Sequence, residues 1–369
     1  MDPHAKYLRS SASICGSIPL SLTLIVITQE CGESQEAKNQ MSHPEQFLNH
    51  NLQIPDLRAE VITLLHQIPA GSISTYGSLA RALGDIKAAK WIGTLLKHDP
   101  DRDQWPWHRI VMQNLQLPLT SGVASSSQQE LLRAEGVTIQ SCRIDPTTPI
   151  FDEFRSDRPL HKLQLDQRDV SERILLTSEF KPPKSVAGID IAYPKPGMAR
   201  AAYVEWNLAN HCVEYELAIE KPIHFPYITG YLTYRELPAY LVLLKAVLAE
   251  RNLAEILLVD GSGILHPRKC GIACHLGVLL NRPTIGVSKK ILTGKVDLTN
   301  QESSEIPILD NQNESAGVAM RKTLENKFVY ASPGHRVGLQ EIPDLLKLCW
   351  FNHRLPEPIY LADKLSKQS

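Results

Sequence analysis

EILLVDGSGILHPRKCG, residues 255–271, is the stretch around which the rest of this sequence is organised. Its apolar residues 256–259 predict a buried strand that runs into Asp260, and the glycines that follow break the strand and expose the acid at its end. SVAGIDIAY, residues 185–193, repeats this pattern around Asp190. Because a carboxylate at the tip of a buried strand needs a cation or hydrogen-bond donors, the two strands together predict a site for one divalent metal. For either acid alone, the alternative is a turn cap.

The composition indicates an ordinary soluble globular protein of two or three domains. The chain has 369 residues, of which 43% are hydrophobic and 21% are charged. The formal net charge of -1 gives no global basic field, so any nucleic-acid site must be local. The seven cysteines lack a paired spacing, which predicts reduced thiols and a cytoplasmic location.

A second metal site is conceivable at a group of cysteines and histidines. Cys270, Cys274 and His275 share one predicted helical run, and His266 lies just before it. This grouping allows a zinc site, but small apolar cysteines at helical spacing are more often core residues. Core packing is the interpretation we prefer.

Residues 49–140 form the first predicted domain, which is mostly helical. Pro55 suits the first turn of a helix that runs through His66. Thr75 is placed to cap a second helix that Gly84 ends, and a third helix is predicted over residues 87–97. Two helices joined by a short glycine turn are the pattern of a helix-turn-helix, a common DNA-binding unit.

Four motifs in this domain, IPAGSISTYGSLARALG, AAKWIG, PWHRIV and SSQQELLRAEGV, follow one another along the chain. In order and spacing they resemble the DNA-binding domain of the guanine alkyltransferases, which implies a winged helix-turn-helix fold. Trp107 stands where that family carries its nucleophilic cysteine. Because tryptophan has no thiolate to accept an alkyl group, alkyl transfer is excluded at this position. The tryptophan is typical of alkyltransferase-like proteins, which bind alkylated guanine without repairing it.

The resemblance also implies which residues contact DNA. Tyr76 would help to rotate the damaged nucleotide out of the stack, and Trp107 would line its pocket beside His108 and Arg109. Lys90 replaces the family's intercalating arginine and is a weaker stacking wedge. The alternative is a degenerate helical domain that grips DNA without specificity.

Residues 141–162 are predicted to be an extended linker because three prolines interrupt a polar stretch. The second domain, residues 163–369, begins with a predicted helix over residues 164–179. Beyond the Asp190 strand, further strands are predicted over residues 199–207, 212–220 and 283–289, helices over 234–250 and 268–280, and a surface loop over 300–317. Three antiparallel strands followed by alternating helices and strands give a ribonuclease H-like order, a mixed sheet with flanking helices. In that order the two acidic strands are neighbours.

The second domain resembles endonuclease V in six motifs that keep the family's order. They are VAGIDIAY, PYITGYLTYRE, LLVDGSGILHPRKCGIACHLG, TIGVSKK, SPGHRVG and PIYLADKL. The resemblance implies an enzyme that nicks the second phosphodiester bond on the 3′ side of a deaminated base, above all hypoxanthine. The products would carry a 3′-hydroxyl and a 5′-phosphate.

Hydrolysis of a phosphodiester requires an activated water and neutralisation of the charge that grows on the phosphate, which carboxylate-held Mg²⁺ supplies, with Mn²⁺ as a substitute. We expect Asp190, Asp260 and Glu236 to bind the metal, and Asp363 to close the acidic cluster. Without the motifs, Glu236 is equally a helix N-terminal acid and Asp363 a residue of a solvated helix face. Lys289 is predicted on the scissile phosphate and His266 beside the metal or the leaving oxygen. For each of the two, a structural role is the alternative.

Lesion recognition is expected from the segment PYITG. Tyr227 offers an aromatic wedge that can stack where a base has been extruded, and Pro226 stiffens the loop. Thr229 replaces a second proline of the family and loosens the wedge.

The sequence therefore predicts a fusion of an alkyltransferase-like module and a magnesium-dependent endonuclease V. The expected partner is damaged DNA, single or double stranded, carrying hypoxanthine or alkylated guanine. RNA and downstream repair proteins are further candidate partners, and no membrane partner is expected. Two alternatives remain, a non-enzymatic damage sensor and an inosine-specific endoribonuclease.

Residues 1–48 read as a disordered tail or as an upstream extension of the reading frame, with Met41 as the start. The apolar run within them, residues 17–28, is too short to span a bilayer. A chain that begins at Met41 should keep full solubility and nicking activity. Comparing the two chains in a sedimentation and nicking assay tests this, and loss of either property in the shorter chain would contradict it.

Overall fold

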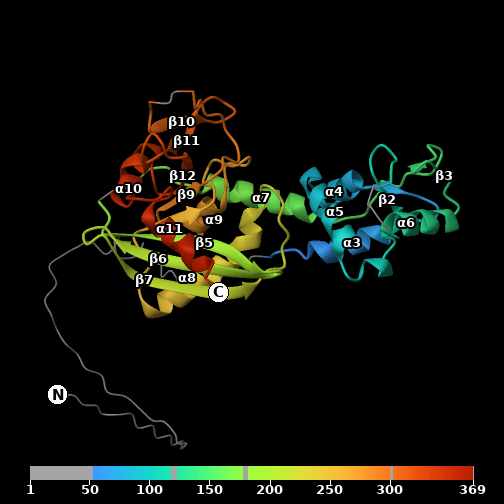
Figure 1. The fold of residues 1–369 in the computed structure, drawn as a ribbon, viewed down its shortest axis with the longest axis horizontal. Coiled ribbons are helices and arrows are strands. Elements are labelled where there is room, and N and C mark those ends of the chain that lie inside the picture. The colour runs from blue at the N-terminus through green and yellow to red at the C-terminus, as the bar shows by residue number, and fades with distance from the viewer. Residues whose placement is uncertain (1–52, 118–122, 178–181, 300–301, 369) are drawn as a thin grey trace, which may run out of the picture. The chain divides into compact units, whose positions relative to one another are not determined.

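The computed structural model describes residues 53–117, 123–177, 182–299 and 302–368. All of these residues belong to one structural unit that extends over residues 44–369. Figure 1 shows its helices and strands in chain order. The predictions for residues 1–48, including a start at Met41, lie outside the described residues.

The first helices lie where the sequence predicts them. The cap of the second is Thr75, whose hydroxyl oxygen accepts a hydrogen bond from the Ser78 amide, and the helix ends at Gly84, with a left-handed φ of 106°. A short 3-10 turn then leads into the third helix. The elements are α3 (Leu57–Leu65), α4 (Tyr76–Leu83), η1 (Ile86–Ala88) and α5 (Ala89–His98). The predicted helix pair with a short turn is confirmed.

Short elements complete the N-terminal half. They are β1 (Ser74–Thr75), η2 (Arg102–Gln104), η3 (Trp107–Arg109), β2 (Ile110–Val111), α6 (Val123–Ala134), β3 (Ile139–Gln140) and β4 (Arg143–Ile144). β1 pairs with β2 in parallel, and β3 pairs with β4 in antiparallel fashion. These elements enclose a small apolar core of Ile73, Val111, Leu117, Leu132, Val137 and Ile144.

The segment predicted as a linker, 141–162, is bonded to the N-terminal half. The Ile73 amide donates to the Pro149 carbonyl at 2.9 Å, and the Phe151 amide donates to the Ile73 carbonyl at 2.8 Å. The next helix, α7 (Pro159–Glu172), begins five residues before the predicted start at 164 because Pro159 is suited to the first turn. The helix ends at Glu172, so the predicted extension toward residue 179 is wrong over residues 173–177.

The C-terminal half is built on a sheet of eight strands. The strands are β5 (Ser185–Lys195), β6 (Met198–Asn207), β7 (Cys212–Pro222), β8 (Ile256–Asp260), β9 (Thr284–Ser288), β10 (Glu305–Leu309), β11 (Ser315–Met320) and β12 (Val329–His335). Their order across the sheet is β10-β11-β12-β9-β8-β5-β6-β7. β5, β6 and β7 form an antiparallel meander, whereas β8 runs parallel to both β5 and β9. The predicted large mixed sheet is confirmed.

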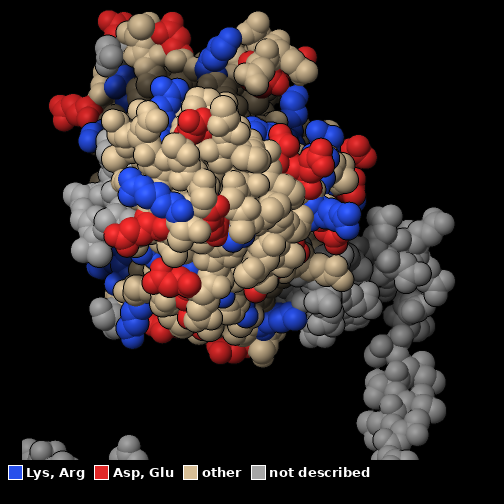
Figure 2. Space-filling model, turned by 90° about the vertical axis from the view of Figure 1, so that its right-hand side faces the viewer, with Lys and Arg blue, Asp and Glu red and all other residues tan. Residues whose placement is uncertain are grey.

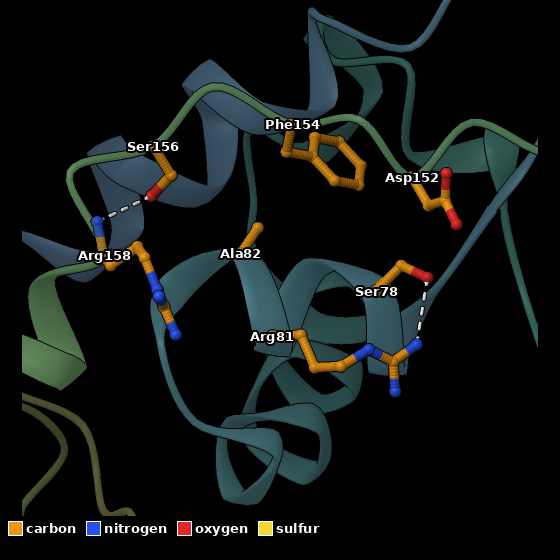
Figure 3. A pocket seen from close by; sticks show the side chains of 7 residues that line it. All are labelled: Ser78, Arg81, Ala82, Asp152, Phe154, Ser156 and Arg158. Atoms are coloured by element: carbon orange, nitrogen blue, oxygen red, sulfur yellow. Dashed lines mark hydrogen bonds between the residues drawn. The ribbon is translucent and has the colours of Figure 1, made fainter.

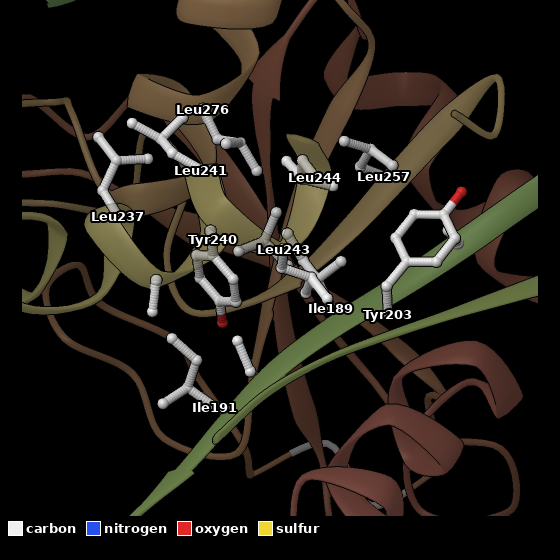
Figure 4. Packing of buried hydrophobic residues seen from close by; sticks show 14 of the residues in the cluster. Ile189, Ile191, Tyr203, Leu237, Tyr240, Leu241, Leu243, Leu244, Leu257 and Leu276 are labelled. Carbon is white, nitrogen blue, oxygen red and sulfur yellow. The ribbon is translucent and has the colours of Figure 1, made fainter. Parts of the chain in front are cut away.

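Helices pack against both faces of this sheet. The helices are α8 (Leu232–Glu250), α9 (Ile272–Leu280), α10 (Ile342–Leu348) and α11 (Glu357–Ser366). Along β8, Leu257 and Val259 join the core that contains α8 and α9, whereas Ile256 and Leu258 join the core that contains α10 and α11. Figure 4 shows the first of these cores, in which the leucines of α8 lie over β5 and β6. The alternation explains why β8 is apolar at every position before Asp260.

Two predictions in this half are wrong. The surface loop predicted over 300–317 contains the hairpin strands β10 and β11. Their apolar residues Ile306, Ile308 and Ala316 are buried beside Leu265, but polar neighbours hide this short alternation in the sequence. The helix predicted from 268 begins only at Ile272, because the residues before it form a turn.

Charges of both signs are interspersed on the face that Figure 2 shows, with no field of one sign, as the net charge of -1 leads one to expect. Within the described ranges, no helix is both long and apolar enough to cross a membrane.

Glu135, next to the end of α6, ties together the N-terminal half. Its carboxylate accepts hydrogen bonds from Arg109 Nη2 at 2.6 Å, from His108 Nε2 at 2.8 Å and from the Gly71 amide at 3.2 Å. Burial alone would raise the pKa of Glu135, but these donors lower it to about 2. The ion pair therefore stabilises the folded state at every pH at which Glu135 is ionised.

Replacing Glu135 with glutamine should lower the free energy of unfolding at pH 7 by about 3 kcal/mol, because it leaves the half-buried Arg109 without its anionic partner. The folded-state pKa lies below the unfolded value of 4.5, so this contribution is complete above about pH 4.5 and is lost as the pH falls toward 2. Denaturant unfolding at pH 7 and pH 3 measures it, with Glu130→Gln on the exposed face of α6 as the control. An equal loss of stability at both pH values would contradict this account.

Candidate active site

Asp190 and Asp260 lie side by side at one edge of the sheet. β5 and β8 are parallel, and their register pairs Ile189 with Val259, so that the acids that follow in each strand lie at the same level. Asp190 is 6% exposed and lies inside the sheet, whereas Asp260 ends its strand. The expected pairing of the two acidic strands is confirmed by this register.

A third acid, Asp363, comes from α11. Ligand oxygens of Asp190, Asp260 and Asp363 all lie within 4.8 Å of one another. α11 comes this close because Gly188 in β5 has no side chain, and a Cβ there would overlap the Pro358 carbonyl in the first turn of α11. The three carboxylates lie close enough together to hold one metal ion, and the predicted role of Glu236 as a further ligand remains a prediction.

The electrostatics of the three acids explain why they need a cation. Burial raises the pKa of Asp260 well above its usual range, and the adjacent Asp190 raises it further. Burial also raises the pKa of Asp190, against the hydrogen bond that Ser366 Oγ donates to it at 3.0 Å. Burial alone would raise the pKa of Asp363, but Lys289 and Lys367 each donate a hydrogen bond at 2.6 Å and lower it instead.

Glu236 lies in α8 close to these acids but makes its own contact. It is buried, and its Oε1 accepts a hydrogen bond from the Tyr193 hydroxyl at 2.6 Å. Arg235 Nε donates in turn to the Tyr193 oxygen at 3.1 Å. Burial raises the pKa of Glu236 to about 8. The sequence does not single out Tyr193 or Ser366. Only the folded structure identifies them, because it places their hydroxyl groups against Glu236 and Asp190.

The acids open into a cavity of about 460 Å³. Its lining includes Asp190, Glu236, Asp260, Lys289, His266 and Tyr227. The structure therefore brings together the residues that the sequence predicted for the nuclease site. Asp363 joins them through its ion pair with Lys289.

Tyr227 projects from the loop between β7 and α8. Its side chain is 64% exposed, whereas its neighbours Phe225, Ile228 and Tyr231 are buried and anchor the loop. Thr229 is exposed. A rigidly anchored loop with one exposed aromatic ring has the form expected of a wedge.

His266 is held by backbone groups on both sides of its ring. Nε2 lies 3.1 Å from the Gly230 carbonyl, and Nδ1 accepts a hydrogen bond from the Arg268 amide at 3.2 Å. Burial lowers the pKa of His266 to about 3, so the ring is neutral near pH 7. Whether His266 has a role beside the metal or leaving oxygen or a structural one remains a prediction.

The cysteines near His266 are core residues. Cys270 and Cys274 are buried in a small apolar cluster with Val170. His275 Nε2 lies 3.1 Å from Asp166, and its Nδ1 lies 3.3 Å from Cys270 Sγ. The burial of both cysteines in this cluster agrees with the core packing that the sequence favoured.

The predicted DNA-contacting residues of the N-terminal half divide into two sets. Tyr76 and Lys90 lie toward the surface of α4 and α5, and the Tyr76 ring packs beside Gly93. Trp107 is 8% exposed and lies under Arg102, whose guanidinium carbon is 4.6 Å from its ring centre. His108 and Arg109 both form hydrogen bonds with the Glu135 carboxylate. The roles of all five in DNA binding remain predictions.

The chain matches two families of known proteins. The model of a family described as Endonuclease V matches residues 168–364, and the model of the 6-O-methylguanine DNA methyltransferase DNA binding domain matches residues 56–137. A bifunctional methyltransferase/endonuclease of Picrophilus torridus is 32% identical over 301 residues, which cover 80% of this chain and 95% of that protein. Endonuclease V of Azotobacter vinelandii is 37% identical over 207 residues, which cover 56% of this chain and 92% of that protein.

Solved structures agree with the C-terminal match. Human ENDOV superimposes with a TM-score of 0.52 at 28% identity, covering 56% of this chain and 96% of that one. Ciona intestinalis endonuclease V, in complex with a 24mer DNA that contains an inosine followed by a ribo-adenosine, gives a TM-score of 0.53 at 27% identity, covering 57% and 97%. The chain belongs to the endonuclease V family, and an alkyltransferase-like DNA-binding domain precedes the endonuclease within it.

Proposed function

We propose that this protein is a metal-dependent repair endonuclease that nicks the second phosphodiester bond on the 3′ side of hypoxanthine in DNA, leaving a 3′-hydroxyl and a 5′-phosphate. The observation that carries the proposal is the group of three carboxylates within 4.8 Å of one another, beside the cavity that Tyr227 lines. Membership of the endonuclease V family supports the reaction class, and the inosine-containing strand bound by the Ciona intestinalis relative supports the lesion.

We further propose that the sheet is ribonuclease H-like and that the N-terminal half is a winged helix-turn-helix domain. In support, the meander β5-β6-β7 is followed by β8 on the other side of β5, with helices on both faces. The division into residues 49–140, a linker over 141–162 and residues 163–369 also remains a proposal.

The donors suit Mg²⁺, with Mn²⁺ as a substitute, because hard divalent cations prefer carboxylate oxygens. Asp190, Asp260 and Asp363 would hold the ion, with Glu236 at its edge. The bound ion would supply Lewis-acid stabilisation of the phosphate and a more acidic water.

The surrounding residues would orient the reactants. Lys289, held at 2.6 Å from Asp363, lies where it can bind the scissile phosphate. Glu236, fixed by Tyr193, can accept a hydrogen bond from the attacking water. Tyr227 and Pro226 would occupy the gap left by the extruded base, and His266 would hold Gly230 beside it.

The N-terminal half would bind alkylated guanine without transferring the alkyl group, because Trp107 supplies no thiolate. Tyr76 and Lys90, on the surface of the two helices, are proposed to contact the DNA. We also propose that the protein acts in the cytoplasm.

Cleavage of inosine-containing RNA is the second candidate, because the strand bound by the Ciona intestinalis relative carries a ribonucleotide directly after its inosine. Matched DNA and RNA strands in one nicking assay distinguish the two. A purely binding sensor is disfavoured, since all four predicted acids lie at the cavity or in the carboxylate group.

Replacing Asp190 with alanine should lower the rate of nicking at least about a thousandfold, equivalent to about 4 kcal/mol in the barrier, because it removes a metal ligand. Binding to a hypoxanthine strand should remain, since the side chain contacts metal and not phosphate. Asp190→Asn, which keeps the shape, and Asp344→Asn, on an exposed helix face, are the matched variants. Nicking by either Asp190 variant at the wild-type rate would refute the assignment.

Replacing Trp107 with alanine should weaken binding to alkylated guanine and leave hypoxanthine cleavage unchanged. Because the side chain is buried, the substitution will also cost about 3 kcal/mol of stability, and Trp107→Phe serves as the milder variant. Both activities are measured on the same preparation, so that normal cleavage shows a folded chain. A joint loss of both in the phenylalanine variant would mean that the two sites are not independent.

A further inference from the structure

The turn after α4 is hydrogen-bonded to the loop that carries Tyr227. The Tyr231 hydroxyl donates to Asp85 Oδ2 at 2.6 Å. Gln164 Nε2, from α7, donates to the same oxygen at 3.2 Å and to the Tyr231 oxygen at 2.7 Å. Tyr231 is completely buried, whereas Asp85 and Gln164 are half-buried, so these bonds are partly shielded from water. They fix the position of the turn relative to the loop.

The packing around these bonds leaves little freedom. A Cβ on Gly84 would lie 2.5 Å from the His161 amide nitrogen, so α7 lies directly on the end of α4. One apolar core contains residues from both halves of the chain. Its members near the turn are Leu83, Ala88, Leu160, Leu163, Phe225, Ile228 and Tyr231. The contact is therefore a packed interface and not a loose tether.

Lys87 gains a particular position from this interface. Its Nζ lies 3.8 Å from the point that a Cβ on Gly230 would occupy, and Gly230 lines the catalytic cavity next to Tyr227. The backbone of Lys87 is fixed, because its amide donates to Asp85 Oδ1 at 3.0 Å. The side chain is exposed, and among the described residues no acid lies within ion-pair distance of its ammonium.

A second cation lies on the same glycine. Arg268 Nη2 is 3.2 Å from the same Cβ point and donates to the Gly230 carbonyl. Unlike Lys87, Arg268 is engaged, since it also donates to Gln167 and stacks over the Tyr231 ring at 4.7 Å. Both charges act on the cavity: after burial, Arg268 is the main cause of the lowered pKa of His266, and Lys87 contributes in the same direction.

Building on the function proposed above, we propose that Lys87 belongs to the DNA site of the nuclease and contacts a backbone phosphate next to the extruded base. The N-terminal half thus completes the substrate site of the C-terminal half. A lysine ammonium is a compact charge with three donors, suited to a phosphate. Lys87 is a positioning residue and takes no part in the chemistry.

Lys87→Ala in the full chain tests the proposal, with Lys87→Arg as the conservative variant and Lys97→Ala, on the last turn of α5, as the charge-matched control. The substrate is a DNA strand with one hypoxanthine and no alkylated base, at several salt concentrations. Lys87→Ala should raise KM about fivefold at an unchanged kcat, and Lys87→Arg should restore it. Binding is measured with chains that also carry Asp190→Asn, so that the strand is not cut. In these chains, Lys87→Ala should reduce the slope of log Kd against log salt concentration by about 0.7–0.9.

The same measurements with Trp107→Phe added determine whether the phosphate contact of Lys87 belongs to the nuclease site or to the site at Trp107. The effect of Lys87→Ala should persist there, because the contact belongs to the nuclease site. If Lys87→Ala nicks like Lys97→Ala, or if its effect disappears with Trp107→Phe, the inference is overturned while the proposed function stands. A wild-type chain that does not nick the strand would overturn both.

Discussion

The parallel pairing of β5 with β8 is the constraint on which the catalytic half depends. It sets Asp190 and Asp260 at one level, where burial raises the pKa of each. The charge of Asp190 raises the pKa of Asp260 further, and the charge of Asp363 raises that of Asp190. Such a pair is unfavourable in the apo protein and becomes favourable when a cation binds. The fold tolerates this unfavourable pair because the two strands are buried on both faces. The core of α8 and α9 covers one face, and the core of α10 and α11 covers the other. The stability of the sheet thus compensates for a destabilising site.

In the N-terminal half, a carboxylate is again close to other polar side chains, but there its partners are basic residues. Arg109 and His108, which a DNA-binding domain could present to phosphates, are engaged by Glu135. The charge of Arg109 is neutralised by this pairing, and Trp107 lies beside both residues, under Arg102. The contacts with DNA proposed for this half therefore rest on exposed residues such as Lys90 and Lys87. This agrees with a chain whose net charge is close to zero and whose basic residues must act locally.

The sequence predicted elements and motif residues well where the signal is local. Thr75 and Gly84 mark a helix through capping alone, and residues 256–259 mark a strand by an unbroken apolar run. It failed where burial depends on distant partners. Ile306 and Ile308 form a strand because Leu265 covers them, and no local pattern reveals that. Likewise, Tyr193 and Ser366 reach the acids from elements far apart in the sequence, so only the folded chain identifies them.

The junction between the halves changes how the fusion should be understood. A flexible linker would raise the local concentration of the nuclease at any lesion within reach, with little regard to direction. Here residues 149–151 pair with Ile73, Gly84 abuts His161, and Asp85 holds Tyr231. A packed interface of this kind fixes both distance and orientation. It favours one geometry of bound DNA over others, so that the gain from fusion lies in the shape of the shared site more than in tethering.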